Sequence, residues 1–304
     1  MLVPRPDMEW EAGGVFAPAV VQRHDGYHML YRAFGRDHIS RLGYATSPDG
    51  LAWRRHTKPV AVPEFPDEHY GLEDPRSVVI DGVLLTCYTA ASGHQEKDGW
   101  HWRTRIHFLS SRDNNTFVRI IPKLPDFNNK DATLFPRKIN GSYYMLHRPI
   151  PDIWISRSED LVNWSDHRRL LAPVEGSWQS LRIGAGPPPI ETDQGWLLFT
   201  HGVAADLTYC MSAVLLDLED PSIVKARLPY PLLVPGTSYE LNGYVPRVVF
   251  GTGLTKEGDT LRLYYGGADY DIAAAEISQA AVLSALADYP ATTASPRPFE
   301  AASA

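Results

Sequence analysis

The residues DGYHMLYRA, at positions 25–33, decide the fold, because the same pattern returns four more times along the chain. Each copy joins a turn that contains glycine to an alternating run of aromatic or aliphatic residues, which is the pattern of a β-hairpin. The other copies are DGVLLTCYTA from position 81, NGSYYMLHRP from 140, QGWLLFTHGV from 194 and EGDTLRLYYGGAD from 257. Their turn glycines, Gly26, Gly82, Gly141, Gly195 and Gly258, predict five β-sheet units of similar length.

A short run that contains proline precedes each turn, and further alternating runs follow it. The five prolines are expected at the starts of strands, where a missing N–H breaks no ladder: Pro18, Pro75, Pro136, Pro188 and Pro246. Four strands per unit and five units predict an all-β fold, a five-bladed β-propeller. A β-sandwich would not explain why proline and glycine recur in one order five times. Residues 278–288, SQAAVLSALAD, predict a short C-terminal helix with Ser278 as its N-cap.

The chain has 304 residues, of which 44% are hydrophobic and 21% charged, enough to bury a large core. Residues 1–290 are expected to form a single propeller domain, and residues 291–304 a disordered tail. The net charge of −7 contains no block of like charge, which disfavours nucleic acid as a partner. No stretch approaches the ~18 apolar residues of a membrane span. We therefore expect a cytoplasmic protein without a membrane partner. Whether it forms a homo-oligomer stays open.

Polar residues gather at the ends of the predicted inner strands. Several open the first strand of a unit or close the second: Arg32, Asp74, Lys130, Asp131, His147, Arg148, Glu191, His201 and Asp269. Because the inner strands of a propeller line its central channel, these side chains are expected to converge in a polar funnel. Carboxylates and cations around a small cavity suit a polyhydroxylated ligand, since carboxylates accept from sugar hydroxyls and arginine holds anions.

Seven segments, taken together and in order, resemble glycoside hydrolase family 130, the β-mannoside phosphorylases and β-1,2-mannosidases. The similarity runs from Gly14 to Ile272. The segments are GLEDPRSVVIDG, KDATLFPRKINGSYYMLHRP, DIWISRSEDLVNW, IGAGPPPIETDQGWLLFTHGV, LLDLEDP, YELNGYVPRVVFGTG and YYGGAD. The resemblance implies an enzyme that cleaves terminal β-mannosidic bonds with inversion, in β-1,2-linked mannooligosaccharides.

The resemblance also implies roles for single residues. Asp74 matches the proton donor, which acts on the glycosidic oxygen through a sugar hydroxyl. Arg32, Lys130 and Arg148 match basic residues around the sugar and phosphate, with Lys130 and Arg148 as the anion ligands. Asp131 and Asp269 match ligands of sugar hydroxyls.

Three further polar side chains complete the predicted site. His147 and His201 are expected to bind substrate by hydrogen bonds, because no second His or Cys lies at metal-ligand spacing. Tyr209 is a further candidate for substrate binding. We therefore predict no metal and no cofactor, with inorganic phosphate as co-substrate if the enzyme is a phosphorylase.

Two glutamates decide which acceptor the sequence favours. Glu191 stands where many phosphorylases of the family have lysine, in PPIET instead of PPIKT, and a carboxylate there would repel phosphate. It could instead act as general base for water, about 6.5–9.5 Å from the acid in an inverting hydrolase. Glu240 is a second candidate base. On this ground water is favoured over phosphate, and a phosphorylase that releases mannose 1-phosphate is the alternative.

Two other classes of function stay open. One is a propeller that binds glycans without catalysis. The other is a furanosidase similar to families 43 and 32, whose segment patterns fit this chain poorly. Finally, the polar and aromatic stretch 94–105, HQEKDGWHWRTR, is expected to form part of the entrance and to help choose the leaving sugar.

Overall fold

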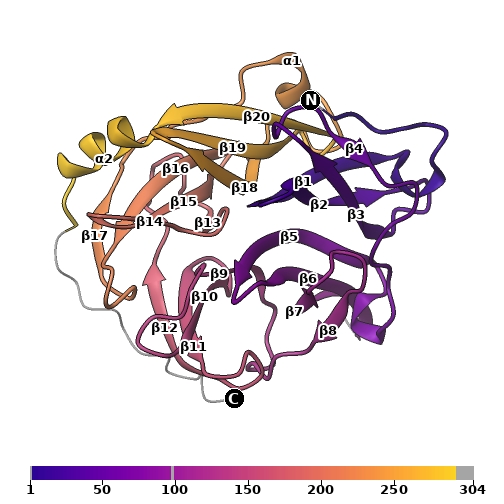
Figure 1. Cartoon of the computed structure of the whole chain (residues 1–304), viewed down its shortest axis with the longest axis horizontal. Helices are drawn as coiled ribbons and strands as arrows, with labels where there is room; N and C mark the ends of the chain where they lie inside the picture. The colour runs from indigo at the N-terminus through magenta and orange to yellow at the C-terminus, as the bar shows by residue number, and fades with distance from the viewer. Residues whose placement is uncertain (1, 97–98, 292–304) are drawn as a thin grey trace.

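The β-strands form blades around one axis in the computed structural model, which describes residues 2–96 and 99–291 (Figure 1). The first two blades are joined into one sheet by a single parallel pair, Ser40 with Gly71. The prediction of a five-bladed β-propeller is confirmed. Blade 1 contains β1 (Gly14–Arg23), β2 (Gly26–Phe34), β3 (Ser40–Ser47) and β4 (Arg54–Arg55). Blade 2 contains β5 (Gly71–Ile80), β6 (Val83–Glu96), β7 (Gly99–Ser111) and β8 (Val118–Ile120). Blade 3 contains β9 (Lys130–Leu134), β10 (Tyr143–Arg148), β11 (Ile153–Ser158) and β12 (Trp164–Leu171).

The last two blades depart from four regular strands. In blade 4 the inner strand is split into β13 (Arg182–Ala185) and β14 (Ile190–Thr192), which both pair with β15 (Gly195–Val203). The strands β16 (Tyr209–Leu216) and β17 (Val224–Arg227) complete this blade. Blade 5 contains β18 (Val249–Glu257), β19 (Thr260–Gly267) and β20 (Asp271–Ser278). Leu2 pairs with Ile272 of β20, so that the N-terminal segment closes the ring against the last blade.

The turn glycines lie where the sequence predicts them, whereas several of the prolines do not. All five turn glycines lie at the turn between the first and second strands of their blades, where Gly26 and Gly195 are the first residues of β2 and β15. All have positive φ, from 58° at Gly258 to 149° at Gly195. The prediction that prolines open strands is wrong for Pro18 and Pro75, which lie inside β1 and β5, and for Pro136, which follows the end of β9. Both strands have a bulge at or next to the proline. In β5 the ladder skips Pro75, so its missing N–H costs no hydrogen bond, whereas in β1 the ladder skips Ala17 and pairs Pro18 with Tyr31.

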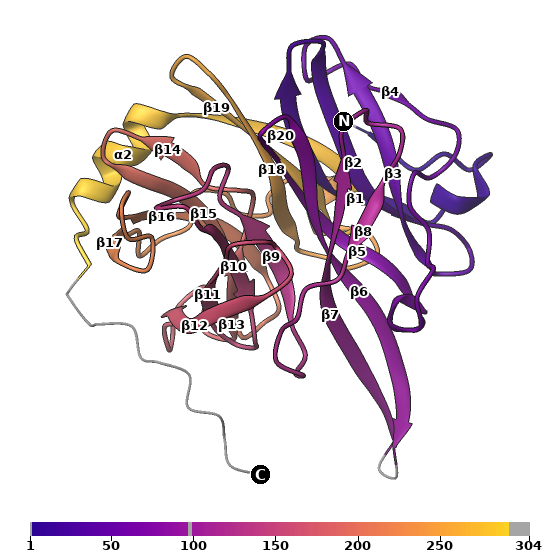
Figure 2. The same ribbon diagram turned by 60° about the horizontal axis from the view of Figure 1, so that its bottom comes forward.

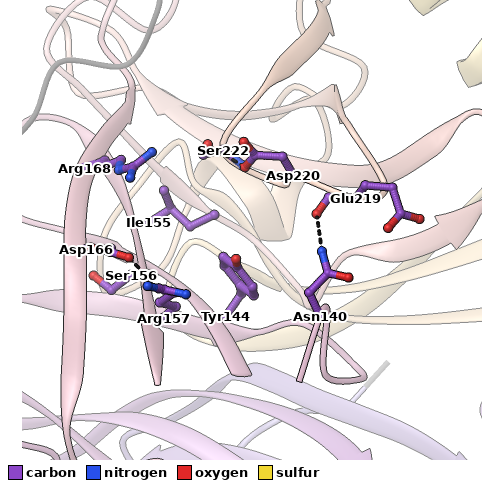
Figure 3. A pocket seen from close by; sticks show the side chains of 10 residues that line it. All are labelled: Asn140, Tyr144, Ile155, Ser156, Arg157, Asp166, Arg168, Glu219, Asp220 and Ser222. Atoms are coloured by element: carbon purple, nitrogen blue, oxygen red, sulfur yellow. Dashed lines mark hydrogen bonds and ion pairs between the residues drawn. The ribbon is translucent and has the colours of Figure 1, made fainter. Parts of the chain in front are cut away.

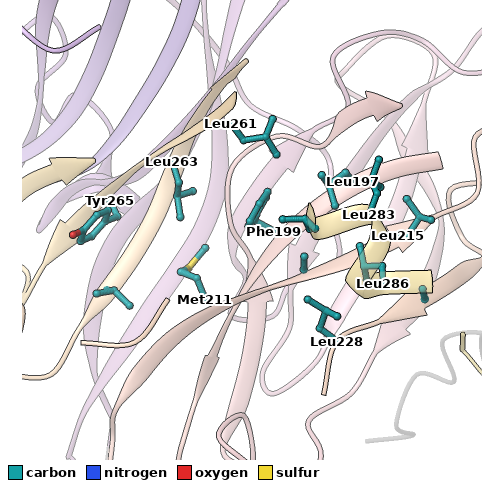
Figure 4. Close-up of a cluster of buried hydrophobic side chains, with 14 of the residues drawn as sticks. Leu197, Phe199, Met211, Leu215, Leu228, Leu261, Leu263, Tyr265, Leu283 and Leu286 are labelled. Carbon is teal, nitrogen blue, oxygen red and sulfur yellow. The ribbon is translucent and has the colours of Figure 1, made fainter. Parts of the chain in front are cut away.

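Hydrophobic side chains pack between neighbouring blades, with one cluster for each of the five interfaces. Figure 4 shows the cluster between blades 4 and 5, where Leu197 and Phe199 face Leu261 and Leu263. A sixth, smaller cluster around Phe16 and Phe250 joins blades 1 and 5 close to the axis. Because each blade is held by both neighbours, the central ends of the strands are fixed relative to one another.

Four short helical segments complete the described chain: η1 (Glu9–Glu11), η2 (Pro66–Glu68), α1 (Ser238–Leu241) and α2 (Gln279–Ala287). The predicted C-terminal helix is confirmed as α2, and the hydroxyl of Ser278 accepts a hydrogen bond from the Ala281 N–H, as an N-cap does. Leu283 and Leu286 anchor this helix in the cluster between blades 4 and 5. None of the helices in the described residues is long and apolar enough to cross a membrane. From residue 292 onward, the predicted tail lies outside the described residues.

Candidate active site

Three aspartates from three blades adopt a backbone conformation that is uncommon for residues other than glycine. Asp74 in β5, Asp131 in β9 and Asp269 after β19 have φ values of 50°, 55° and 51°. In β5 and β9 these residues lie at bulges where the ladder skips. Aspartate tolerates this left-handed conformation better than most residues, and such strain persists where the surrounding structure holds it in place. The bulged strands therefore help to direct three carboxyl groups toward the axis.

These carboxyl groups meet the other predicted polar residues in one pocket on the axis, with a volume of about 80 Å³. Every blade contributes at least one side chain. The pocket is lined by Arg32, Asp74, Lys130, Asp131, Arg148, His201, Tyr209, Val248, Phe250 and Asp269. Eight of the eleven residues predicted for the site are thus brought together, although they lie far apart in the sequence.

Asp74 is held between two cations. Its carboxylate lies 3.0 Å from Nη1 of Arg32 and 3.8 Å from Nζ of Lys130, and Arg32 also binds Glu73 at 2.6 Å. Burial alone would raise the pKa of Asp74, but Arg32 and Lys130 outweigh burial and lower it. Asp74 is therefore ionised in the free pocket at neutral pH. Lys130 is the more loosely held cation, with 27% of its side chain exposed.

Asp131 is completely buried and is the anionic centre of the pocket floor. Its carboxylate lies 2.9 Å from Nε of Arg148, 3.5 Å from Nη2 of Arg76 and 3.4 Å from Nε2 of His201. Burial opposes ionisation, but Arg148, His201 and Arg76 together bring the pKa of Asp131 well below its usual value. Burial lowers the pKa of His201 to about 4, so its imidazole is neutral at physiological pH. A neutral imidazole can donate from one ring nitrogen and accept at the other.

The pKa of Asp269 is shifted in the opposite direction to those of Asp74 and Asp131. Burial raises its pKa to about 7, and the nearby carboxylate of Asp74 adds to the effect, whereas Arg32 opposes it. One carboxyl group that is ionised at neutral pH and one that is about half protonated there thus share the same small pocket. Such a separation of pKa values is typical of sites that carry out acid–base chemistry.

Arg76 is a central residue that the sequence reasoning missed. It is only 1% exposed, and its guanidinium donates to the carbonyl oxygens of Asp74 at 2.8 Å and of Ala185 and Gly186 at 3.1 Å. The guanidinium also binds Asp131 and lies over the ring of Phe250. One side chain therefore links blades 2, 3, 4 and 5. Its signal in the sequence is a charged residue two positions after Asp74, directly before the apolar end of β5.

Arg182 is a second residue that the sequence reasoning did not place in the site. Its Nη2 donates to the hydroxyl of Tyr209 at 2.5 Å, and its guanidinium lies over the Tyr209 ring. Tyr209 in turn stacks on His201, with ring centroids 6.3 Å apart. Arg182 therefore adds a cation next to the side of the pocket formed by blade 4.

Three predicted site residues do not reach the pocket. Glu191 lies at the surface, where both of its oxygens accept from Arg137 at 2.7 Å. Glu240 is buried, but it accepts from the backbone N–H groups of Gly236 and Thr237 and from the hydroxyl of Tyr265, as part of a capping box.

His147 is the third such residue. It faces away from the axis and contacts Ser156 and Asn129, because the neighbouring Arg148 in the same strand faces the pocket. The expectation that Glu191, Glu240 and His147 join the site is therefore not supported.

Larger hollows lie at the rims of the blades. One, of about 400 Å³, is formed by strands of blade 3 and by the turn that holds Glu219 and Asp220 (Figure 3). Asn140 there donates to the carbonyl oxygen of Glu219, and Arg157 binds Asp166. Its charges are therefore at least partly paired in local contacts. The axial pocket is smaller, but it alone among these hollows combines carboxyl groups of opposed pKa shift with cations from several blades.

A propeller whose carboxyl and guanidinium groups converge on the axis has the architecture of a carbohydrate-cleaving enzyme. The sequence model of glycoside hydrolase family 130, described as β-1,4-mannooligosaccharide phosphorylase, matches residues 7–288. The chain is 45% identical to the 1,2-β-oligomannan phosphorylase of Thermoanaerobacter sp. (strain X514), over 88% of this chain and 91% of that protein.

Solved structures agree with this match. The β-1,2-mannobiose phosphorylase of Listeria innocua, in complex with β-1,2-mannobiose, has 30% identity and a TM-score of 0.82, and the match covers 91% of this chain and 92% of that one. Another structure comes from work on family members that are glycoside hydrolases targeting β-1,2 mannosidic linkages in Candida mannan. It has 27% identity and a TM-score of 0.83, with coverage of 91% and 90%. The chain belongs to glycoside hydrolase family 130 and is an enzyme.

Proposed function

We propose that this enzyme is a phosphorylase that cleaves the terminal bond of β-1,2-linked mannooligosaccharides and releases mannose 1-phosphate with inversion. The observation that carries the proposal is the excess of cations around Asp74 and Asp131: Arg32, Lys130, Arg76 and Arg148. The similarity to a 1,2-β-oligomannan phosphorylase supports both the linkage and the acceptor.

The sequence alone favoured water as the acceptor, and that preference depended on Glu191. Because Glu191 is paired with Arg137 at the surface, it provides no base for water in the pocket and no charge that would repel phosphate there. Glu240 is equally unsuited, since its carboxylate already accepts three hydrogen bonds. Phosphate needs no base, because its anionic oxygens are already nucleophilic at neutral pH. The preference for water is therefore replaced by one for phosphate.

Asp74 is the proton donor in this proposal, as the family resemblance implies. A phosphate oxygen attacks the anomeric carbon, and the bond to the leaving oxygen breaks while Asp74 protonates that oxygen through a sugar hydroxyl. Asp269 and Asp131 accept from hydroxyls of the terminal mannose. His201, neutral and fully buried, adds a hydrogen bond.

Phosphate binding also prepares the acid. In the free pocket Arg32 and Lys130 keep Asp74 ionised, which is the wrong state for a proton donor. A phosphate dianion near Lys130 and Arg148 offsets their positive charge, and a bound sugar excludes water. Both changes raise the pKa of Asp74. The co-substrate thereby favours the protonated form that the reaction needs.

Incubation of the purified enzyme with β-1,2-mannobiose, with and without inorganic phosphate, tests the proposal. We expect mannose 1-phosphate and mannose only when phosphate is present, measured by anion-exchange chromatography. Release of free mannose alone at the same rate in phosphate-free buffer would identify a hydrolase and would refute the proposal.

A further inference from the structure

The hairpin of β6 and β7 extends well beyond the rest of blade 2 (Figure 2). These strands have 14 and 13 residues, and their pairing continues to Glu96 and Gly99, whereas β5 begins opposite Ala91. The strand β6 runs in the same direction as the other second strands, whose ends carry Arg32, Arg148 and His201. The hairpin therefore projects from the face of the propeller on which the pocket lies.

Three aromatic rings gather at this hairpin, two of them on β7 and the third on Tyr70, which directly precedes β5. Trp100 and Trp102 are 51% and 57% exposed, which is unusual for two indoles on one short segment. The ring of Tyr70 lies 5.0 Å from that of Trp102 and 6.1 Å from that of Trp100, between centroids. The indole of Trp100 lies over Gly93, where a Cβ atom would come within 2.6 Å of its Nε1. We call Tyr70, Trp100 and Trp102 the aromatic platform.

The register of the sheet connects the aromatic platform to the pocket. Trp102, Thr104 and Ile106 are two residues apart along β7, so they share one face, and Ile106 lies in the same row of the sheet as Glu73. Glu73 binds Arg32 of the pocket. Tyr70 precedes Asp74 by four residues, or roughly 13 Å along the strand. Gly71 allows the intervening turn, with φ +118° and no room for a Cβ next to Ser40.

The size of the pocket makes a second binding surface necessary for any longer ligand. Its volume of about 80 Å³ is well below the ~300–1,000 Å³ that is usual for ligand sites. The pocket can therefore hold little more than the terminal sugar, and the rest of a chain must lie on the surface around the mouth. The non-polar C–H faces of pyranose rings stack well on exposed indoles, whose rigid rings lose little entropy on binding.

We propose that the aromatic platform binds the mannosyl units of the leaving oligosaccharide beyond the cleaved bond, so that the enzyme prefers chains longer than mannobiose. This inference rests on the function proposed above. The platform is a specificity surface and takes no part in the chemical step. Trp100 and Trp102 belong to the predicted entrance segment 94–105, of which residues 97 and 98 lie outside the described part of the chain.

The test compares β-1,2-mannotetraose with β-1,2-mannobiose as substrates of the W100A/W102A double variant. We expect kcat/KM for the tetraose to fall about 10-fold, which corresponds to about 1.4 kcal/mol for the two lost rings together, and that for the biose to change less than about twofold. Trp102→Phe should keep most of the preference. Tyr289→Ala removes an exposed ring that packs on Tyr230 at the outer edge of blade 4, and it should change neither rate.

Another exposed aromatic side chain, Tyr244, could bind the leaving chain along a different path. Tyr244 is 57% exposed and packs on Phe34, at the end of β2. If Tyr244→Ala removes the preference for the tetraose and the W100A/W102A double variant does not, the chain leaves the pocket on the other side and the proposal is wrong. Equal losses on both substrates would also overturn it, because they indicate damage to the pocket itself.

Binding and association measurements separate this inference from the proposed function. In an Asp74→Asn background, calorimetry with the tetraose reports binding whichever acceptor the enzyme uses. Weaker tetraose binding on loss of both indoles supports the platform even if phosphorolysis fails, and unchanged binding refutes it. Light scattering on the wild type and the W100A/W102A variant tests whether a second copy of the chain, and not the oligosaccharide, covers the aromatic platform. A shift from dimer to monomer with an unchanged substrate preference would show an interface between two copies instead.

Discussion

Arg76→Met removes the side chain that links four blades at the floor of the pocket. Methionine is similar in length and apolar, so it fills much of the space without donating a hydrogen bond. Asp131 loses one of its cations, and the carbonyl oxygens of Asp74, Ala185 and Gly186 lose their donor. All of these groups lie in the interior of the ring, where water cannot readily replace the guanidinium.

The expected cost follows from the burial of the ion pair, because both Arg76 and Asp131 have fully buried side chains. Removal of one partner from such a pair costs about 3–5 kcal/mol of unfolding free energy. In a chain of this size that corresponds to a fall in melting temperature of roughly 5–15 °C. We also expect kcat to fall by about 100-fold, since small displacements of catalytic groups have effects of that size. KM should change less, because the sugar contacts remain.

Denaturation in urea and steady-state kinetics at pH 7 measure both effects. Arg137→Met is the matched control, because this arginine also lies over an aromatic ring, that of Trp196, and pairs with Glu191, but its side chain is 43% exposed. Its loss should cost less than about 1 kcal/mol, as for other surface pairs. Arg76→Lys keeps the charge but not the fork of donors, and we expect intermediate stability. If Arg76→Met is as stable as the control and retains its kcat, Arg76 does not position the site.

Three further predictions concern the carboxyl groups. Asp74→Asn should lower the rate of mannose 1-phosphate release about 100- to 10,000-fold, the range for loss of a general acid, and a loss below tenfold would remove Asp74 from that role. Glu191→Ala should leave this rate within about twofold and stability within about 1 kcal/mol, because its ion pair is exposed; a large loss of rate would restore it as a base. Asp269 has a folded pKa of about 7, above its unfolded value near 3.8, so the folded state binds more protons and stability falls as pH rises between these values. Asp269→Asn should therefore flatten the decline in melting temperature from pH 5 to pH 7, and an unchanged slope would contradict the raised pKa.

Local signals account for most of the fold prediction. A glycine with positive φ and an alternating strand are properties of a few residues, and each was present five times, at Gly26, Gly82, Gly141, Gly195 and Gly258. The bulges at Pro18 and Pro75 could not be predicted from composition, because they depend on how the inner strand curves against its neighbours. The same applies to the split inner strand of blade 4, where the chain leaves the ladder between β13 and β14.

Features of the sequence explain in part why Glu191 and Glu240, which were predicted for the site, do not reach the pocket. The number of residues between a side chain and the turn glycine of its hairpin determines how far that side chain lies from the turn along the blade. Asp74 lies eight residues before Gly82, but Glu191 lies only four before Gly195, which leaves it at the turn end of the blade. For Glu240 the signal was Thr237, three residues earlier, since a Thr-x-x-Glu sequence is a capping box.

His147 could not be separated from Arg148 by sequence alone. It lies six residues after its turn glycine, as Arg32 and His201 do, and would face the axis in a regular blade. An irregular turn, in which Ile139 pairs with Ser142, together with the bulge opposite β10, shifts the register. A shift of one residue moves every side chain of a strand to the other face.

The left-handed backbone conformation of the aspartates results from the propeller fold and does not depend on their carboxyl groups. Ala17, at the bulge of β1 in blade 1, has φ 47° and is buried without any charge to present. An alanine gains no hydrogen bond there, and the conformation costs roughly 1–2 kcal/mol. The bulge is therefore imposed by packing around the axis in blade 1, and the same device in blades 2 and 3 brings Asp74 and Asp131 to the pocket. Since side chains of the neighbouring blades pack against each blade, the position of an acid in one blade depends on the hydrophobic clusters that this blade shares with its neighbours. This explains why a single side chain, Arg76, can contact four blades and still belong to the site.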